Sequence, residues 1–146
     1  MCKRFVFKNA LSPKNSVLVA AGIFPPDIGG PAIHVEHFLD GFSRSKIKVG
    51  VVTYSDVKIF SPLDDKYNVF RISRKIPFGI RHFYYFLRLL ITATGYDIIY
   101  AQDISAAGLP AFLVSQLLNK RLFIRLVGDI LWERLAEKGK IDLSME

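Results

Sequence analysis

The sequence predicts an α/β fold, with a Rossmann-like open, mostly parallel sheet and helices on both faces. Five short runs rich in apolar and β-branched residues alternate with helical patterns along the chain. The first run, residues 16–21, is apolar without a break, as expected of a strand that helices cover on both faces. A turn that contains Gly29 and Gly30 then leads into an amphipathic helix. Strand–helix alternation with right-handed crossovers produces this class of sheet.

The first helix is expected at residues 32–44, where apolar side chains recur at helical spacing. Its stripe consists of Val35, Phe38, Leu39 and Phe42. The second strand is expected at 46–55 and a short third strand at 69–74. The segment between them, 56–68, contains proline and aspartates and is predicted as a loop or a short edge hairpin.

The second long helix is expected at residues 79–94, followed by a strand at 97–101. Gly95 ends the helix at the position after its C-cap. One face of the helix is expected to pack on the sheet, and its members are Phe83, Phe86, Leu87, Leu90 and Ile91.

A third helix is expected at residues 105–118, ending at Asn119. Because Pro110 lies inside this pattern, either the regular helix begins near Leu109 with the proline in its first turn, or the helix is kinked there. The fifth strand is expected at 121–127 and a last helix at 130–138.

Length and composition indicate one domain, residues 1–146, that is large enough to bury a core. The hydrophobic fraction is 51% and no apolar run is long enough to span a bilayer. Cys2 is the single cysteine, so no internal disulfide can form, which favours a reducing cytoplasm. The expected location is therefore cytoplasmic, with peripheral attachment to the inner face of the membrane as a variant.

The chain is basic, with a formal net charge of +7. No long Lys/Arg block and no aromatic–basic RNA-binding pattern is present, so nucleic acid is not the expected partner. An anionic lipid surface or a sugar nucleotide fits the charge equally well. Residues 71–88 interleave aromatics with cations. Four of these cations form either a solvated helix face or a membrane patch: Arg74, Lys75, Arg81 and Arg88.

Three loops are expected to meet at the carboxyl ends of the strands, where open α/β sheets bind ligands. They are residues 22–31, 102–105 and 128–130, and the first precedes a helix whose positive end suits a phosphate. They contribute Gly29 and Gly30, Gln102 and Asp103, and Gly128 and Asp129.

Each of these residues also has a purely structural interpretation. Gly29 and Gly30 either serve a tight turn that needs positive φ, or give a phosphate room to approach, which we favour. Asp103 and Asp129 either cap helices or bind hydroxyl groups, and Ser105 is an alternative cap beside Asp103.

The histidines of the first helix are weak candidates for ligand contacts. His34 is close enough to the glycine turn in sequence to reach an acceptor hydroxyl, whereas His37 points away from the apolar stripe as a surface histidine. Their spacing is poor support for a metal site, and none is predicted.

Several motifs resemble the amino-terminal domain of the family 4 GT-B glycosyltransferases. They are Phe-Pro-Pro-Asp-Ile-Gly-Gly-Pro-Ala at 24–32, Val-Gly-Val-Val-Thr at 49–53, Tyr-Asp-Ile-Ile-Tyr-Ala-Gln-Asp at 96–103 and Arg-Leu-Val-Gly-Asp-Ile-Leu-Trp-Glu-Arg at 125–134. The resemblance covers residues 16–138. Family members often have a histidine where this chain has Gly128, and histidine or another polar residue at Gln102.

The resemblance implies a retaining sugar transfer from a nucleotide-sugar donor, without a metal. Gly29 and Gly30 would then contact the donor diphosphate. His34, Gln102, Asp103, Gly128 and Asp129 become candidates for acceptor or sugar contacts, and no catalytic residue is assigned. The nucleotide sugar is a co-substrate, so no other cofactor is expected.

On this resemblance the chain is the acceptor-side half of such an enzyme, and the carboxy-terminal nucleotide-binding domain is absent. The acceptor would be a polysaccharide or a lipid-linked saccharide, and the chain alone would be inactive until a separate domain or subunit completed the cleft. The alternative is a non-catalytic subunit or binding module that recruits a partner to the membrane. A flavodoxin-like or response-regulator-like protein fits less well, because only Asp27 is acidic after the first strand.

Overall fold

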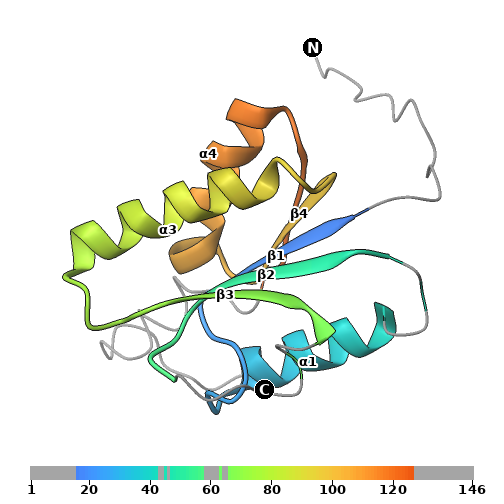
Figure 1. Ribbon diagram of the computed structural model, residues 1–146, viewed down its shortest axis with the longest axis horizontal. Helices are drawn as coiled ribbons and strands as arrows, with labels where there is room; N and C mark the ends of the chain where they lie inside the picture. Colours follow the sequence, from blue (N-terminus) through green and yellow to red (C-terminus); the bar gives the residue numbers. More distant parts are fainter. Residues whose placement is uncertain (1–15, 43–44, 46, 58–62, 64–65, 127–146) are drawn as a thin grey trace, which may run out of the picture.

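The fold is built on one five-stranded sheet in which every strand pair is parallel. The structure, a computed structural model, describes residues 16–126 except 43–44, 46, 58–62 and 64–65 (Figure 1). The strand order is β3-β2-β1-β4-β5. The strands are β1 (Val17–Ala21), β2 (Val49–Tyr54), β3 (Asn68–Ile72), β4 (Ile98–Ala101) and β5 (Arg121–Ile124).

Strand β1 lies at the centre of the sheet and pairs with β2 on one side and β4 on the other. Val19 of β1 is opposite Val51 in β2 and opposite Tyr100 in β4. Strands β2 and β3 therefore lie on one side of β1, and β4 and β5, which follow in the chain, lie on the other side. The connections that leave β1 and β4 diverge at this point, which is where open α/β sheets leave a crevice for ligands.

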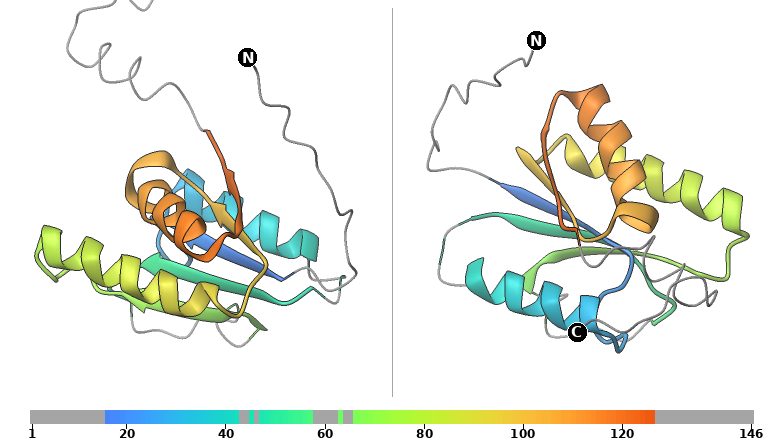
Figure 2. Two further views of the ribbon diagram at one scale, coloured as in Figure 1. Left: turned by 90° about the horizontal axis from the view of Figure 1, so that it is seen from above. Right: turned by 180° about the vertical axis from the view of Figure 1, so that it is seen from behind.

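Helices cover both faces of the sheet (Figures 1 and 2). Helix α1 (Gly30–Phe42) lies on one face, and α3 (Phe78–Ala93) and α4 (Leu109–Leu118) lie on the other. A short π-helical segment, η1 (Ile104–Gly108), joins β4 to α4. The predicted fold class is confirmed.

The sheet separates two apolar cores. On the α1 face, Val35 and Leu39 are fully buried against β1 and β2, while Phe38 and Phe42 pack around them partly buried. The stripe predicted for this helix is thus confirmed. On the opposite face, residues of α3 and α4 pack over the sheet, among them Tyr85, Leu89 and Val114.

The predicted packing face of the second long helix is wrong in part. Helix α3 buries Tyr85, Leu89 and Ala93, and Phe86 and Leu90 are partly buried beside them. Phe83 and Ile91, which were expected to face the sheet, are 62% and 64% exposed. Aromatic and aliphatic side chains lie around most of this helix, so its sequence contains two apolar stripes. Which stripe packs on the sheet depends on how the helix crosses the strands.

The ends of the last two described helices follow local sequence signals. Helix α4 begins at Leu109 with Pro110 in its first turn, where the missing N–H costs no helical hydrogen bond. The first of the two interpretations of Pro110 is therefore confirmed. Asn119 ends the helix in the left-handed conformation, with φ of 50°. Gly95 follows Thr94, the C-cap of α3, as predicted, but it does not adopt a left-handed φ.

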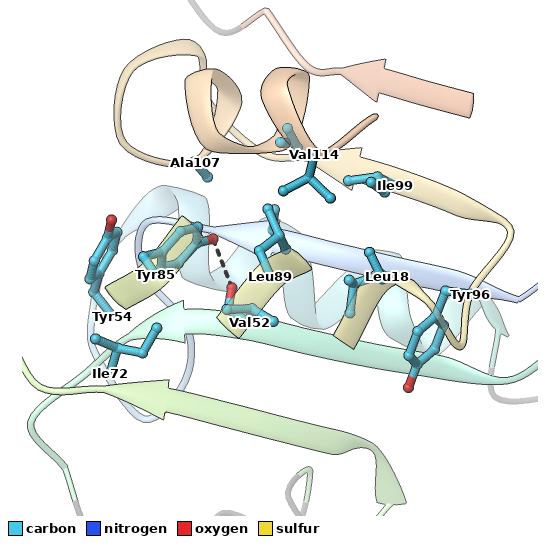
Figure 3. Close-up of a cluster of buried hydrophobic side chains, with 14 residues drawn as sticks. Leu18, Val52, Tyr54, Ile72, Tyr85, Leu89, Tyr96, Ile99, Ala107 and Val114 are labelled. Carbon is cyan, nitrogen blue, oxygen red and sulfur yellow. Dashed lines mark hydrogen bonds between the residues drawn. The ribbon is translucent and has the colours of Figure 1, made fainter. Parts of the chain in front are cut away.

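Tyr85 connects α3 to the carboxyl ends of the two central strands (Figure 3). Its hydroxyl donates to the Val52 carbonyl at 3.0 Å and lies 3.3 Å from the Ala21 carbonyl. Burial raises the pKa of the Tyr85 hydroxyl well above its ordinary value, so it stays protonated and remains a donor. Among the described helices, none is both long and apolar enough to cross a bilayer.

Replacing Tyr85 with phenylalanine should lower the free energy of unfolding by about 1 kcal/mol, because buried strand carbonyls lose a hydroxyl donor. The control is Tyr84→Phe on the same helix, where the side chain is half exposed and a change within about 0.5 kcal/mol is expected. Denaturant unfolding monitored by circular dichroism measures both. Equal losses in the two variants would contradict this role of Tyr85.

Candidate functional site

The turn that follows β1 lies at the point where the strand order changes direction. Phe24 is fully buried beneath it, and the Asp27 amide donates to the Phe24 carbonyl at 3.1 Å. The first helical hydrogen bond of α1 runs from the Ile33 amide to the Gly29 carbonyl at 3.1 Å. Before Ile33, the amides of Gly30 and Ala32 consequently have no acceptor within the helix, and Pro31 between them has no N–H. These two amides and the positive helix end give this end of α1 the character of an anion site.

Side chains from both sides of β1 hold this turn in place. From the β3 side, a guanidinium nitrogen of Arg71 donates to the Pro25 carbonyl at 2.7 Å. Arg74 forms an ion pair with Asp27 at 2.9 Å, and the same nitrogen donates to the Tyr54 carbonyl at 3.0 Å. Contacts with Arg71 and Arg74 thus hold the turn in position.

Gln102 holds the other side of the same turn. Its amide nitrogen Nε2 donates to the Pro31 carbonyl at 2.8 Å, and its backbone amide donates to the Ala20 carbonyl at 2.9 Å. The side chain is only 1% exposed. In this structure Gln102 therefore positions the start of α1 rather than presenting its amide to solvent.

The two glycines of the turn have different surroundings. A Cβ added at Gly29 would lie 3.3 Å from Cδ1 of Ile23, whereas a Cβ at Gly30 would meet nothing within 4 Å. Neither glycine adopts a left-handed φ. Conformational need therefore does not explain either glycine, and packing does not explain Gly30.

Asp103 caps η1 with one of its carboxylate oxygens. Oδ1 accepts from the amides of Ala106 and Ala107 at 2.6 and 2.9 Å. The structure thus selects Asp103 rather than Ser105 as the cap. Oδ2 makes neither capping bond and lies against Gly22, where an added Cβ would come within 2.9 Å of it. The end of β1 and the cap of η1 are therefore in close approach.

His34 lies on the opposite side of the turn from Arg74, against β4. Its Nε2 is 3.4 Å from the Tyr100 hydroxyl. Burial lowers the pKa of His34, and the positive charges of Arg125 and His37 lower it further. The imidazole is therefore neutral at pH 7. His37 is exposed, as predicted.

An open cavity of about 300 Å³ lies between the carboxyl ends of β1 and β2 and the amino-terminal end of α3. We refer to it as the cation-lined cavity. Its lining consists of Gly22, Tyr54, Arg74, Phe78, Arg81, His82, Ser105 and Ala106.

Contacts between neighbouring side chains order the cation-lined cavity. The Tyr54 hydroxyl is 2.8 Å from Nδ1 of His82, and the Tyr54 ring stacks on Tyr85 with 4.3 Å between ring centroids (Figure 3). Arg81 donates to the Arg74 carbonyl at 3.0 Å, and its guanidinium carbon is 5.5 Å from the Tyr54 ring centroid. Burial raises the pKa of Tyr54 well above its ordinary value, so the phenol is protonated at any pH near neutrality.

The structure places the four cations predicted as a membrane patch in different surroundings. Arg74 and Arg81 line the cavity. Arg88 places its guanidinium carbon 4.2 Å from the Phe70 ring centroid, and Lys75 is exposed. Two of the four thus belong with the loops at the carboxyl ends of the strands.

Of the predicted site residues, Gln102 contacts the glycine turn at Pro31, and Asp103 lies against Gly22 at the end of β1. Gly128 and Asp129 lie outside the described residues. Sequence reasoning missed Tyr54 and His82 as members of a site. Tyr54 ends a buried strand and His82 lies within an aromatic helix, so no local signal separates either from a core residue. Over the part of the chain that the structure describes, no group of three or more His, Cys, Asp or Glu side chains could hold a metal ion.

Comparison of the chain with protein-family models and with curated protein sequences gives no match.

Replacing Arg125 with glutamine should raise the pKa of His34 toward its ordinary value of 6.5, because removing a nearby positive charge makes the imidazolium less costly. His37→Asn should raise it less, since His37 contributes the smaller charge effect. Titration of the imidazole proton resonances by NMR measures both shifts. A His34 pKa that is unchanged by Arg125→Gln would contradict this account of its environment.

Proposed function

We propose that this chain is the amino-terminal, acceptor-side domain of a retaining glycosyltransferase that uses a nucleotide-sugar donor. Its acceptor would be a polysaccharide or a lipid-linked saccharide. The parallel sheet with its change of strand order supports this proposal, as do the motifs at residues 24–32, 96–103 and 125–134 that resemble such enzymes. A second domain or subunit would supply the main nucleotide-binding wall.

The observation that carries the proposal is the open space at Gly30. This residue begins α1, is exposed, and needs neither left-handed φ nor room for a neighbouring side chain. A ligand that approaches the backbone closely would account for a glycine here, and the positive end of α1 makes an anionic diphosphate the suitable ligand.

In this proposal the remaining residues of the site have supporting roles. Arg74 and Gln102 keep the turn in its binding position through Asp27 and Pro31. Asp103 orients a sugar hydroxyl through Oδ2, because Oδ1 is occupied by the amides of η1. Catalysis needs a donor and an acceptor held together, so the domain acts with the wall that binds the nucleotide.

Replacing Gly30 with valine should weaken binding of a nucleotide sugar by about tenfold or more, since the added side chain occupies the approach to the first amides of α1. Stability should change little, because the site is open. Calorimetric titration with UDP-glucose, GDP-mannose and related sugar nucleotides measures the affinity, and thermal unfolding measures the stability.

Gly41→Val is the matched control, because Gly41 lies on the same helix and a Cβ there also meets nothing within 4 Å. Its affinity for the sugar nucleotide should equal that of the unaltered chain. The proposal fails if no sugar nucleotide binds, or if both variants bind as the unaltered chain does.

A second candidate function, attachment to an anionic membrane, is favoured by the outward face of α3 and α4. Both helices carry exposed large apolar side chains and contain no acidic residue that would repel lipid headgroups. The exposed members are Phe78, Ile80, Phe83, Tyr84, Leu87, Ile91, Leu109, Phe112, Leu113 and Leu117.

The double substitution Phe83→Gln/Ile91→Gln should lower binding to phosphatidylglycerol-containing vesicles by about tenfold or more. The variant lacks two apolar side chains whose transfer from water into the membrane would favour binding. Ile28→Gln/Ile33→Gln is the control, since Ile28 precedes α1 and Ile33 lies on it, away from the α3–α4 face, and both are exposed. Vesicle sedimentation measures binding. Equal binding by both double variants would contradict a membrane role for the α3–α4 face.

A further inference from the structure

We propose that the cation-lined cavity binds a phosphoryl group, and that this group belongs to the sugar acceptor. The assignment to the acceptor rests on the proposed function, whereas the anion site rests on the cavity alone. The diphosphate of the donor is assigned to Gly30, on the other side of the Asp27–Arg74 ion pair, so the cavity would serve a second, separate phosphate.

Two side-chain nitrogens on the lining residues have no hydrogen-bond partner in the part of the chain that the structure describes. They are Nε of Arg81 and Nε2 of His82, and both atoms are buried. When the Tyr54 hydroxyl donates to Nδ1 of His82, the neutral ring carries its own proton on Nε2. A buried donor without an acceptor is unfavourable, and oxygen atoms of a bound anion would supply what is missing.

The charge around the cavity favours an anion. Arg74 is paired with Asp27, but no carboxylate within the described residues forms a salt bridge with Arg81. Asp103 directs one oxygen at the amides of η1 and is not part of the lining, although its negative charge acts on the lining residue Tyr54. Arg81 is thus a cation of the lining without a salt-bridge partner among the described residues, and guanidinium groups match the geometry of phosphate oxygens.

The amino-terminal end of α3 adds to the same effect. The first helical hydrogen bond runs from the Arg81 amide to the Pro77 carbonyl at 2.9 Å, so the amides of residues 78–80 have no acceptor within the helix. This end of α3 has no side-chain cap and no acidic residue in its first turn. It therefore leaves its positive dipole end unneutralised beside Arg81 and His82.

The size of the cavity limits the ligand. A volume of about 300 Å³ is at the lower end of the range for small-molecule sites. It suits a phosphate and the atoms attached to it rather than a whole sugar nucleotide. A soluble sugar phosphate and a phospholipid or lipid phosphate share this chemistry.

The test titrates the full chain with inorganic phosphate, glucose 1-phosphate and dihexanoyl phosphatidic acid at constant ionic strength. Amide and imidazole resonances of residues 78–82 should shift on addition of phosphate, with the His82 ring among them. Arg81→Gln should weaken phosphate binding by about tenfold. Arg88→Gln, which removes the same charge from the same helix but from a guanidinium placed over Phe70, should leave it unchanged.

Glucose 1-phosphate and dihexanoyl phosphatidic acid distinguish the two sources of the phosphate. The probe that binds more tightly, and whose binding is weakened by Arg81→Gln, identifies the source as a soluble sugar phosphate or a lipid phosphate. The proposal is overturned if none of the three probes shifts residues 78–82, or if Arg81→Gln and Arg88→Gln weaken binding equally. The His82 ring shift is read from the unaltered chain, so the test does not depend on the variants folding.

The two proposals fail separately. Gly30→Val should weaken the binding of UDP-glucose by about tenfold or more and leave phosphate binding at the cavity intact, and Arg81→Gln should do the reverse. If UDP-glucose binds but phosphate does not, the proposed phosphate site in the cavity is contradicted, whereas the proposed function is not.

Discussion

The pairing of β1 with β2 on one side and β4 on the other is the constraint on which the rest of the structure depends. It places a fully buried strand at the centre of the sheet and sends its exit turn to the point where the connections diverge. The turn is then within reach of side chains from both sides of β1: Arg74, which follows β3, and Gln102, which follows β4. Its shape is set by the protein, so a ligand would find the first amides of α1 already in position.

The same arrangement explains why the cation-lined cavity lies where it does. Tyr85 reaches from α3 to the Val52 carbonyl and supports the stacked ring of Tyr54, which in turn contacts His82. The core packing of α3 thus continues directly into the wall of the cavity. Because buried tyrosines remain protonated, this wall offers hydrogen bonds without adding negative charge that would repel an anion.

Much of the fold follows from patterns in the sequence, because strand–helix alternation, the stripe of Val35 and Leu39 and the first-turn position of Pro110 are local signals. The face of α3 is not a local property: Phe83 and Tyr85 are both suitable core residues, and only the crossing of the helix over the sheet decides between them. The cavity could not be predicted for a related reason. Tyr54, Arg74 and His82 come from three separate segments, and their proximity depends on the strand order.

A structure of the chain bound to a nucleotide sugar tests the central claim most directly. The account predicts that the diphosphate oxygens lie within hydrogen-bond distance of the amides at the start of α1, beside Gly30, with Arg74 still paired to Asp27. A diphosphate bound in the cation-lined cavity, with the Gly29–Gly30 turn empty, would contradict it.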